Sequence, residues 1–367
     1  MRNQRQKEFT EFLINHEHGI LNLCCRFGKC KVVIDYLKAK EYNNILIIHP
    51  IIPIKKSWQD DFIKWGFDAS KVKFATTASL TKIHEMKFDV IISDEIHQFS
   101  QKQLQYLRFL IRNQDVKRCI GLSGTLSDRS TQIIKEYTGL EVINTYSMEQ
   151  GINEGIISDY RITIVTTSLD NKVKYITPNK TKPSFKVTEQ EQYNYFTRQI
   201  DRIKEEGGDL GFLPIMRLNL FKKSIAKQEL TKKLVEKYSD ERLLIFCGVT
   251  TTADSLGVSV FHSKSSEEHI KDDFCNGKIQ HLAVCKMLNA GVTVLPINRA
   301  IINSFDSNSE TTGQQLNRLT NFEYDNPNKV AQVTIVSTNA IAELKWLSKA
   351  LSFFNPDKII YKKYEEL

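Results

Sequence analysis

Residues 21–33 read LNLCCRFGKCKVV, an apolar run that passes through a Gly-Lys pair into a segment with helical spacing. A turn of this kind aims backbone N–H groups, and the positive end of the following helix, at a bound anion. The pattern therefore predicts a phosphate-binding loop at Gly28 and Lys29. The usual consensus has glycine where this chain has Leu23, and Ser or Thr where it has Cys30. Taken by itself, this segment is also compatible with an ordinary strand-to-helix turn that binds no phosphate.

Short apolar runs alternate with amphipathic segments around this loop. In residues 56–66, for example, Trp58, Phe62 and Trp65 fall on one helical face. The apolar runs are rich in Val, Ile and Leu, which is typical of parallel strands covered on both faces. The runs before residue 145 are GILNLCC, NILIIHP, VKFATTA, FDVIISDE and RCIGLSG. Strands that alternate with helices predict an α/β domain with a parallel sheet.

The same alternation begins again in the second half of the chain, with the runs RLLIFCG, VSVFH, IQHLAVCK, RAIINS and AQVTIVST. A length of 367 residues also favours two domains, because single cores stop growing at roughly 250–300 residues. We therefore expect one domain over residues 1–150 and another over residues 151–367, with SMEQGINEGIISDYRI leading into the second. The alternation lapses at about residues 169–213, which predicts an insertion or an elaborated connection.

Composition narrows the class of protein. The chain has 51 Lys and Arg against 43 Asp and Glu, a net charge of +8 that is compatible with a polyanionic partner. No apolar run approaches the ~18 residues that a membrane span requires. The 7 cysteines include no CxxC pair, which favours a reducing compartment over a disulfide framework or a structural zinc site. We expect a cytoplasmic protein with no membrane partner.

A pair of acids follows the apolar strand in FDVIISDEIHQFS. Asp94 and Glu95 stand at the carboxyl end of that strand, the edge at which open α/β sheets bind ligands. One carboxylate there can hold Mg²⁺, and its neighbour can orient and deprotonate an attacking water. An acidic cap on the next helix is the alternative, and the two adjacent acids followed by Ile-His argue against it.

These motifs together resemble those of superfamily 2 helicases of the DExH group. Gly28-Lys29 is similar to motif I, Asp94-Glu95-Ile96-His97 to motif II and GLSGTLSD to motif III. The remaining segments resemble, in order, motifs Ia, Ib, IV, V and VI: ILIIHPIIPIKKSWQDDFIKWG, FATTASLTK, RLLIFCGVTTTADSLG, HLAVCKMLNAGVTVLPINRAIIN and GQQLNRLTN. The resemblance covers nearly the whole chain and is closest in character to compact helicases and translocases of phages and other viruses.

The resemblance implies two tandem RecA-like domains with parallel sheets and a nucleotide cleft between them. It implies an ATP hydrolase in which Lys29 binds phosphate, Asp94 holds Mg²⁺ and Glu95 is the catalytic base. Gln314 (or Gln315) and Arg318 would reach the γ-phosphate from the second domain. The residues that would contact the nucleotide in the first domain are Gln4 or Gln6 (at the adenine), Arg26, Phe27, Gly28, Lys29, Cys30 and Asp94.

The resemblance further implies a nucleic-acid partner, with DNA favoured over RNA. The residues that would couple the state of the bound nucleotide to the interface between the domains are His97, Ser123 and Thr125. The residues expected to grip the phosphate backbone, independently of base sequence, are His49, Pro50, Thr76, Thr77, Ser263, Lys264 and Lys286. We expect a helicase or translocase that acts on branched or single-stranded DNA, as a monomer.

Some positions depart from the family pattern. The thiol of Cys30 is a poor ligand for a hard cation. Asn321 stands where relatives carry a second motif VI arginine, and Thr293 where they often carry an acid. These departures leave an alternative open, in which the chain is a nucleic-acid-binding clamp or subunit whose weakened ATPase is completed by an arginine from a protein partner.

Overall fold

The computed structural model divides the chain into two compact units. The first contains Met1–Asp159, and Thr320 joins it through a hydrogen bond from the Ser158 N–H to the Thr320 carbonyl (3.0 Å). The second begins at Tyr160. The structure describes residues 1–16, 18–83, 86–113, 116–172, 174–176, 185–263, 269–285, 297, 299–305, 309–316, 319–320, 326 and 328–367.

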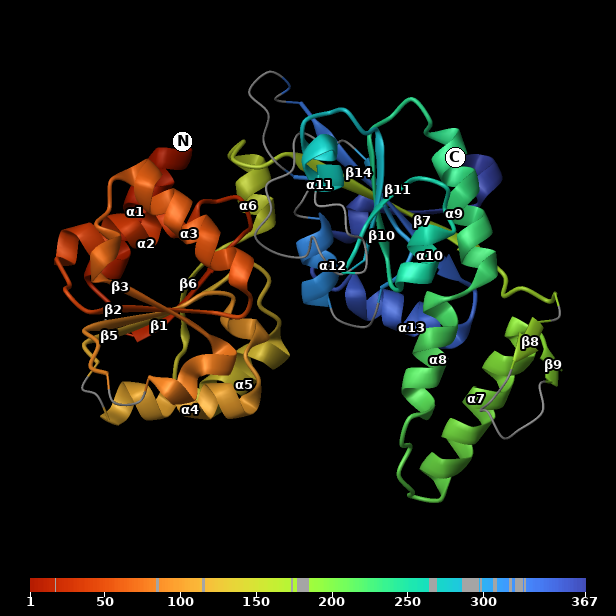
Figure 1. Ribbon diagram of the computed structural model, residues 1–367, viewed down its shortest axis with the longest axis horizontal. Helices are drawn as coiled ribbons and strands as arrows, with labels where there is room; N and C mark the ends of the chain where they lie inside the picture. The colour runs from red at the N-terminus through yellow and green to blue at the C-terminus, as the bar shows by residue number, and fades with distance from the viewer. Residues whose placement is uncertain are drawn as a thin grey trace. The chain divides into compact units, whose positions relative to one another are not determined.

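The first unit is built on a parallel sheet, as the apolar runs predicted (Figure 1). The sheet has six strands in the order β3-β2-β4-β5-β1-β6, and β6 is not among the apolar runs identified from the sequence. Strand β2 is almost wholly apolar because alternate residues enter different cores: Ile45 and Ile47 pack on one face of the sheet, Leu46 and Ile48 on the other. The strands are β1 (His18–Leu23), β2 (Ile45–His49), β3 (Val72–Thr76), β4 (Val90–Ser93), β5 (Arg118–Ser123) and β6 (Val142–Tyr146).

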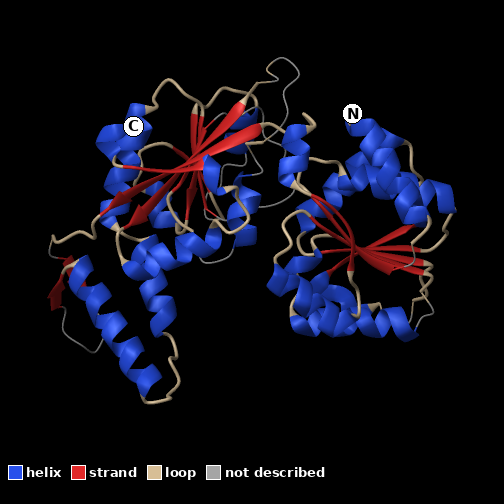
Figure 2. Ribbon diagram, turned by 180° about the vertical axis from the view of Figure 1, so that it is seen from behind, coloured by secondary structure: helices blue, strands red, loops and turns tan. Residues whose placement is uncertain are grey.

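Helices cover both faces of this sheet (Figure 2). Trp58 and Phe62 of α3 pack into one core, and Leu104 and Leu107 of α4 into the other, so the apolar stripe at 56–66 does face a core. The helices are α1 (Arg2–Ile14), α2 (Lys29–Lys40), α3 (Ile52–Trp65), α4 (Gln101–Asn113), α5 (Asp128–Thr138) and α6 (Met148–Asn153). Short 3₁₀ turns are η1 (Ala69–Lys71), η2 (Thr77–Lys82) and η3 (Ile96–Gln98).

The second unit has a seven-stranded sheet of order β11-β12-β10-β13-β14-β7-β15. Its strands are β7 (Asp159–Thr167), β10 (Leu243–Cys247), β11 (Ser259–Phe261), β12 (His281–Cys285), β13 (Arg299–Ile302), β14 (Val330–Thr338) and β15 (Ile359–Lys362). Its helices include α9 (Ile225–Lys237), α10 (Thr250–Asp254), α11 (His269–Cys275), α12 (Ser309–Leu316) and α13 (Ile341–Ala350), with 3₁₀ turns η4 (Pro356–Lys358) and η5 (Tyr364–Glu366). Strand β7 begins within the segment read from sequence as the lead into the second domain.

A helical projection extends from the second unit, in the part of the chain where the alternation lapses (Figure 1). It consists of α7 (Glu189–Glu205) and α8 (Leu213–Lys222), which lie side by side and are preceded by an antiparallel pair, β8 (Lys174–Ile176) and β9 (Phe185–Val187). Arg217 Nη1 donates to Thr197 Oγ1 (3.4 Å) between the two helices. At the tip, Phe212 is 78% exposed.

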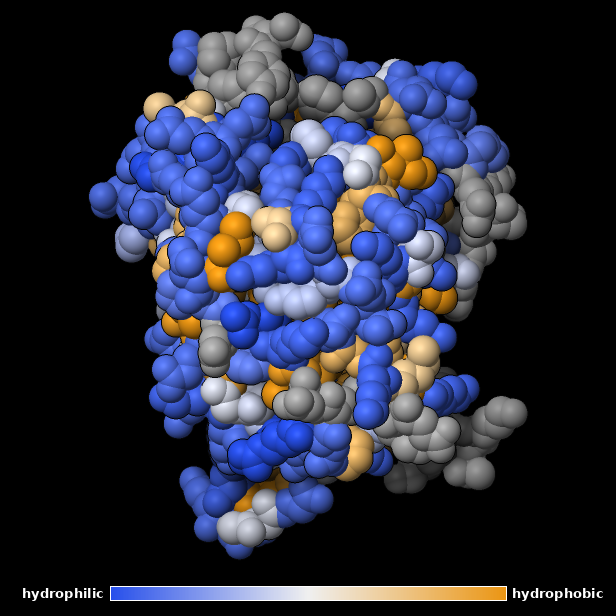
Figure 3. All heavy atoms as spheres, turned by 90° about the vertical axis from the view of Figure 1, so that its left-hand side faces the viewer, coloured by the Kyte–Doolittle hydropathy of each residue, from blue (hydrophilic) through white to orange (hydrophobic). Residues whose placement is uncertain are grey.

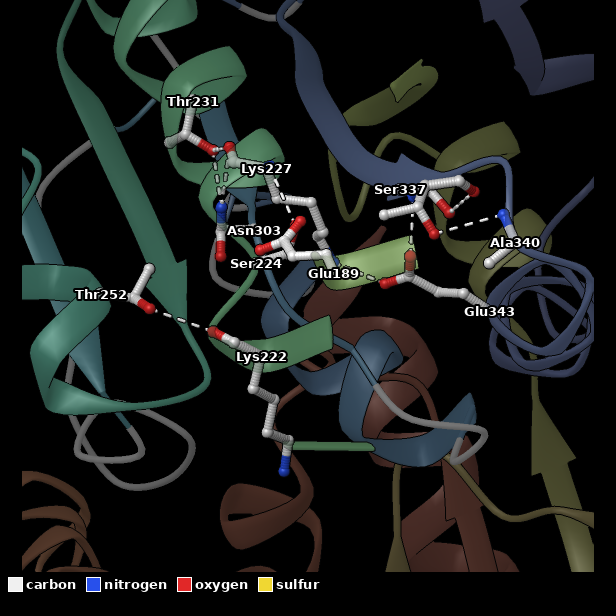
Figure 4. Close-up of polar contacts among 11 residues, drawn as sticks. Glu189, Lys222, Ser224, Lys227, Thr231, Thr252, Asn303, Ser337, Ala340 and Glu343 are labelled. Carbon is white, nitrogen blue, oxygen red and sulfur yellow. Dashed lines mark hydrogen bonds and ion pairs between the residues drawn. The ribbon is translucent and has the colours of Figure 1, made fainter. Parts of the chain in front are cut away.

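A buried polar network anchors the base of this projection (Figure 4). Glu189, at the start of α7, accepts hydrogen bonds from Ser224 Oγ (3.0 Å) and the Ile225 N–H (2.6 Å) at the start of α9. Lys227 Nζ lies 2.6 Å from Glu343 Oε1 of α13, and both side chains are only 1% exposed. Buried charges are tolerated when they are paired and hydrogen-bonded, and this pair ties α9 to α13.

The face in Figure 3 is mainly hydrophilic, with hydrophobic residues scattered among the charged ones as on an ordinary protein surface. In the described part of the chain, none of the helices combines the length and the apolar character that crossing a bilayer would need.

Candidate nucleotide site

The Gly-Lys segment forms the connection between β1 and α2, at the carboxyl edge of the first sheet. Two residues in it have left-handed backbones, Arg26 at φ 68° and Gly28 at φ 99°. A Cβ on residue 28 would overlap Gln6 Nε2, so no larger residue fits there without displacing Gln6. The close approach and the positive φ together account for the glycine.

Gln6 and Gln4, the two candidates for adenine recognition, occupy different surroundings. Gln6 is buried, and its Nε2 donates to the Phe27 carbonyl in the loop (2.7 Å). Gln4 lies at the surface, where its Nε2 donates to Glu8 Oε1 (3.4 Å). The structure thus places Gln6 against the loop and Gln4 away from it.

Lys29, Asp94 and Glu95 meet at this edge because β4, β5 and β1 are neighbours in the sheet. Lys29 Nζ lies 2.9 Å from Glu95 Oε1. Burial alone would lower the pKa of Lys29, but the charges of Glu95, Cys25 and Asp94 outweigh it and raise that pKa above its ordinary value. The lysine is therefore held charged, as a phosphate-binding cation has to be.

Asp94 is fixed by hydrogen bonds to each of its oxygens. Trp58 Nε1 donates to Oδ2 (2.8 Å), and the Glu95 N–H donates to Oδ1 (3.0 Å). Burial raises the pKa of Asp94, and nearby Glu95 adds to this, while the Lys29 charge opposes it. The carboxylate still has lone pairs available for a cation, since each oxygen can accept two bonds.

Cys30 lies in the first turn of α2, where the negative charge of Asp61 on α3 acts on its thiol. Burial raises the pKa of this thiol well above its ordinary value, and the negative charges of Asp94 and Asp61 add to the effect. A neutral thiol is a weak ligand for a hard cation such as Mg²⁺. Asp94 therefore remains the protein oxygen ligand that the motif comparison implies for this cation.

His97, Ser123 and Thr125 form a chain of contacts that begins at Glu95. His97 Nδ1 lies 3.5 Å from Glu95 Oε2 and 2.9 Å from Ser123 Oγ. Ser123 Oγ in turn accepts from the Thr125 N–H (3.3 Å). The geometry connects Glu95 with the end of β5, as a residue set that senses the nucleotide would require.

The loop also holds a partly buried cation, Arg26, that is incompletely paired. Arg26 Nη2 has no hydrogen-bond partner among the residues that the structure describes. Burial and the charge of Arg2 lower the pKa of Arg26. A guanidinium with an unpartnered buried Nη2, three residues before Lys29, suits an anion with several acceptor oxygens, and the Asp94 carboxylate suits a hard cation bound to that anion. The residues present thus fit a nucleotide with Mg²⁺.

Some of the residues expected to contact nucleic acid lie together, at the carboxyl ends of β2 and β3. His49 and Thr76 are register partners at the carboxyl ends of β2 and β3, and Pro50 and Thr77 follow them directly. Burial lowers the pKa of His49, whose Nδ1 lies 2.8 Å from the Ile51 carbonyl. In the second unit Ser263 is an exposed turn residue after β11.

Several expected residues cannot be placed. Lys264, Lys286, Thr293, Arg318 and Asn321 lie outside the described residues. Gln314 and Gln315 belong to α12, where Gln315 is buried and its Oε1 has no partner in the described part of the chain.

Sequence reasoning missed two side chains at the site, Trp58 and Asp61. The apolar stripe correctly placed Trp58 in the core but did not identify a partner for its indole N–H. Because buried indole N–H groups usually find an acceptor, the sequence could have suggested that Trp58 contacts a polar group.

No family model matches the sequence, and no curated protein matches it. Solved structures do match its fold. The helicase domain of Hef from Pyrococcus furiosus has a TM-score of 0.52 and is 11% identical, over 94% of this chain and 97% of that one. Dbp5 from S. cerevisiae, bound to RNA and ADP BeF3, has a TM-score of 0.60 and is 12% identical, over 98% and 89%. The chain has the tandem RecA-like fold of helicases.

A third structure agrees with this fold. It is a fragment of a putative HsdR subunit of a type I restriction enzyme from Vibrio vulnificus, with a TM-score of 0.59 and 15% identity, over 98% of this chain and 67% of that one. The expectation of two α/β domains with parallel sheets is therefore confirmed by the RecA-like units and by these neighbours.

Proposed function

We propose that this protein is an ATP-dependent helicase or translocase of the DExH group of superfamily 2, and that it acts on DNA that is single-stranded or branched. The observation that carries the proposal is the 2.9 Å contact of Lys29 with Glu95, beside Asp94 at the carboxyl edge of a RecA-like sheet. A lysine, a cation-binding carboxylate and a second carboxylate are the groups that nucleoside triphosphate hydrolysis needs. The neighbour Dbp5, solved with RNA and ADP BeF3, supports nucleotide and nucleic-acid ligands for this fold.

The contacts suggest how the residues divide the work. ATP with Mg²⁺ would supply the phosphoanhydride bond to be broken. Lys29 would exchange its contact with Glu95 for phosphate oxygens, which frees Glu95 to accept a proton from water. Contact with His97 would keep the Glu95 side chain oriented while Asp94 holds the cation. The contact between Lys29 and Glu95 would thus keep the base occupied until a phosphate replaces it.

Steady-state ATP hydrolysis with and without single-stranded DNA, forked DNA and single-stranded RNA tests the proposal. Low salt is needed because phosphate contacts weaken steeply as salt rises. We expect stimulation by DNA, and loss of turnover in Lys29→Ala and Glu95→Gln. Lys38→Ala, at an exposed position on the same helix, is the matched control for the lysine. Unchanged turnover in Lys29→Ala or Glu95→Gln would refute the assignment. Stimulation by RNA but not by DNA would identify RNA as the substrate.

A second candidate is favoured by the thiol at position 30. Because burial raises the pKa of Cys30 and keeps this thiol neutral, the site would bind Mg²⁺ weakly, and the chain would serve as a nucleic-acid clamp or subunit completed by a partner's arginine. Cys30→Thr distinguishes the two. A large rise in turnover favours the weakened site, whereas little change favours a motor in which Asp94 and phosphate oxygens suffice.

The proposal includes a cellular setting. We infer a monomer of phage or viral type that works in the cytoplasm of the host. Sedimentation of the purified protein with and without forked DNA tests the monomer, since a second copy bound to the fork would double the protein mass per DNA.

A further inference from the structure

The helical projection brings one lysine to the carboxyl edge of the second sheet. Lys222 is the last residue of α8, at the root of the projection. A Cβ on Gly248, the residue after β10, would lie 2.8 Å from Lys222 Cγ and would overlap Ser304 Oγ. Ser304 follows β13, the neighbour of β10 in the sheet. The aliphatic stem of Lys222 therefore packs on the bare backbone where β10 ends.

Hydrogen bonds fix the end of α8 in this position. The Lys222 carbonyl accepts from Thr252 Oγ1 of α10 (3.0 Å), and Thr252 is fully buried (Figure 4). The carbonyl of the next residue, Lys223, accepts from Gln228 Nε2 of α9 (3.0 Å). The place of Lys222 at the strand end is thus set by two flanking helices rather than by a mobile surface chain.

The ammonium of Lys222 is available to a ligand. The residue is half-buried, and Figure 4 shows its side chain extending away from the network around Glu189. In the described part of the chain, its Nζ forms neither an ion pair nor a hydrogen bond. Lys227, on the neighbouring helix, is instead paired internally with Glu343. Of these two lysines, Lys222 has its charge free for an anion from outside.

The edge on which Lys222 lies is the one at which nucleic acid is expected. Strands β10, β11, β12 and β13 are parallel, so their carboxyl ends meet at one edge of the sheet. Ser263, one of the residues expected to contact the phosphate backbone, follows β11 at this edge. Lys222 lies at the same edge although it belongs to none of the motifs.

We propose that Lys222 is a further nucleic-acid contact, and that its ammonium binds a backbone phosphate of a single strand lying across the carboxyl edge of the second sheet. A lysine acts on phosphate as a point charge, so the contact would be independent of base sequence. The inference rests on the proposed function, because it adds a contact for the nucleic acid of that proposal. The root of the projection would then form part of the track for the strand.

The test is the binding of labelled oligo(dT) to the full chain, followed by fluorescence anisotropy at about 50 mM and about 200 mM salt. Lys222→Gln removes the charge but keeps the Cγ that packs on Gly248. Lys222→Arg keeps the charge. Lys223→Gln is the matched control, since Lys223 is the next residue along the chain and is exposed.

Each phosphate contact on a single strand contributes about 0.7 to the slope of log affinity against log salt. Lys222→Gln should therefore flatten that slope by about 0.7, and should weaken binding roughly eightfold at the lower salt and roughly threefold at the higher. Lys222→Arg and Lys223→Gln should match the unaltered protein. Affinity for a fluorescent ATP analogue without DNA should be the same in all four proteins, which excludes general damage to the fold.

An unchanged slope in Lys222→Gln would overturn the inference, as would an equal loss in Lys223→Gln. A loss of the same size at both salt concentrations would also overturn it, because that result describes a structural role. The expected salt-dependent loss with oligo(rU) but not with oligo(dT) would support the contact and make RNA the partner. If the unaltered protein bound neither strand, the nucleic-acid part of the proposed function would fail, and this inference with it.

Discussion

Removal of one partner from the buried Lys227–Glu343 pair should destabilise the second unit strongly. The charged atoms lie 2.6 Å apart and both side chains are 1% exposed, so water cannot replace the lost partner. At an effective dielectric constant of about 20, a pair at that distance attracts by ~6 kcal/mol. The Phe305 ring, 5.1 Å from Lys227 Nζ, and the Thr338 N–H, 2.7 Å from Glu343 Oε2, would compensate in part.

We therefore expect Lys227→Met or Glu343→Leu alone to cost about 3–5 kcal/mol, the usual result when a buried ion pair loses one member. For a unit of this size that lowers Tm by about 2–4 °C per kcal/mol. The double variant should lie close to the unaltered protein, because replacing a whole buried pair by apolar side chains is often neutral or stabilising.

Urea unfolding followed by Trp346 fluorescence measures these changes. Trp346 belongs to α13, close to Glu343 along the helix, and replacing Trp58 and Trp65 by Phe leaves it as the sole tryptophan. The background itself serves as the reference for every variant. If each single variant cost less than ~1 kcal/mol and the two effects added in the double variant, the pair would not be closed in solution and the reasoning would fail.

Three further outcomes follow from the first unit. Burial raises the pKa of Asp94, so the stability that this group contributes is present below its unfolded pKa and is lost as pH rises through its folded pKa. Asp94→Asn should therefore raise Tm at pH 7, measured by differential scanning fluorimetry. The same variant should abolish ATP hydrolysis in an ATPase assay. Gly28→Ala should cost about 1–3 kcal/mol in urea unfolding and weaken nucleotide binding, because φ 99° is strained for alanine and its Cβ would meet Gln6 Nε2; equal stability would contradict this. Burial raises the pKa of Cys24 and Cys119 to about 12, so both should escape iodoacetamide at pH 8 in the native protein, and labelling detected by mass spectrometry would show that these cores open.

Much of the fold was predictable because its signals are local. The runs that form β2 and β4 are almost wholly apolar, and a short run of this kind favours a strand covered on both faces. Strand β7 was missed, since DYRITIVTT alternates with polar residues and begins within the segment that reads as a linker.

The site was predictable only as far as its motifs extend. Lys29, Asp94 and Glu95 could be named because a phosphate site needs those groups at strand ends. Helical periodicity assigned Trp58 to the core but could not say which polar atom its N–H would meet, since that depends on the packing of α3 against the end of β4. The choice between Gln4 and Gln6 likewise depends on which side of α1 faces the loop.

The tip of the α7–α8 projection is a suitable place to attach a label. Residues 205–209 are all exposed, Gly207 and Gly211 have left-handed backbones, and small exposed loop tips of this kind tolerate insertions well. The network at Glu189 holds the base of the projection, so an added segment would not pull on the sheet. A dye or a tether placed there would label the second unit far along the chain from Gly28 and Lys29, and so would provide a fixed point for testing the proposed motion along DNA.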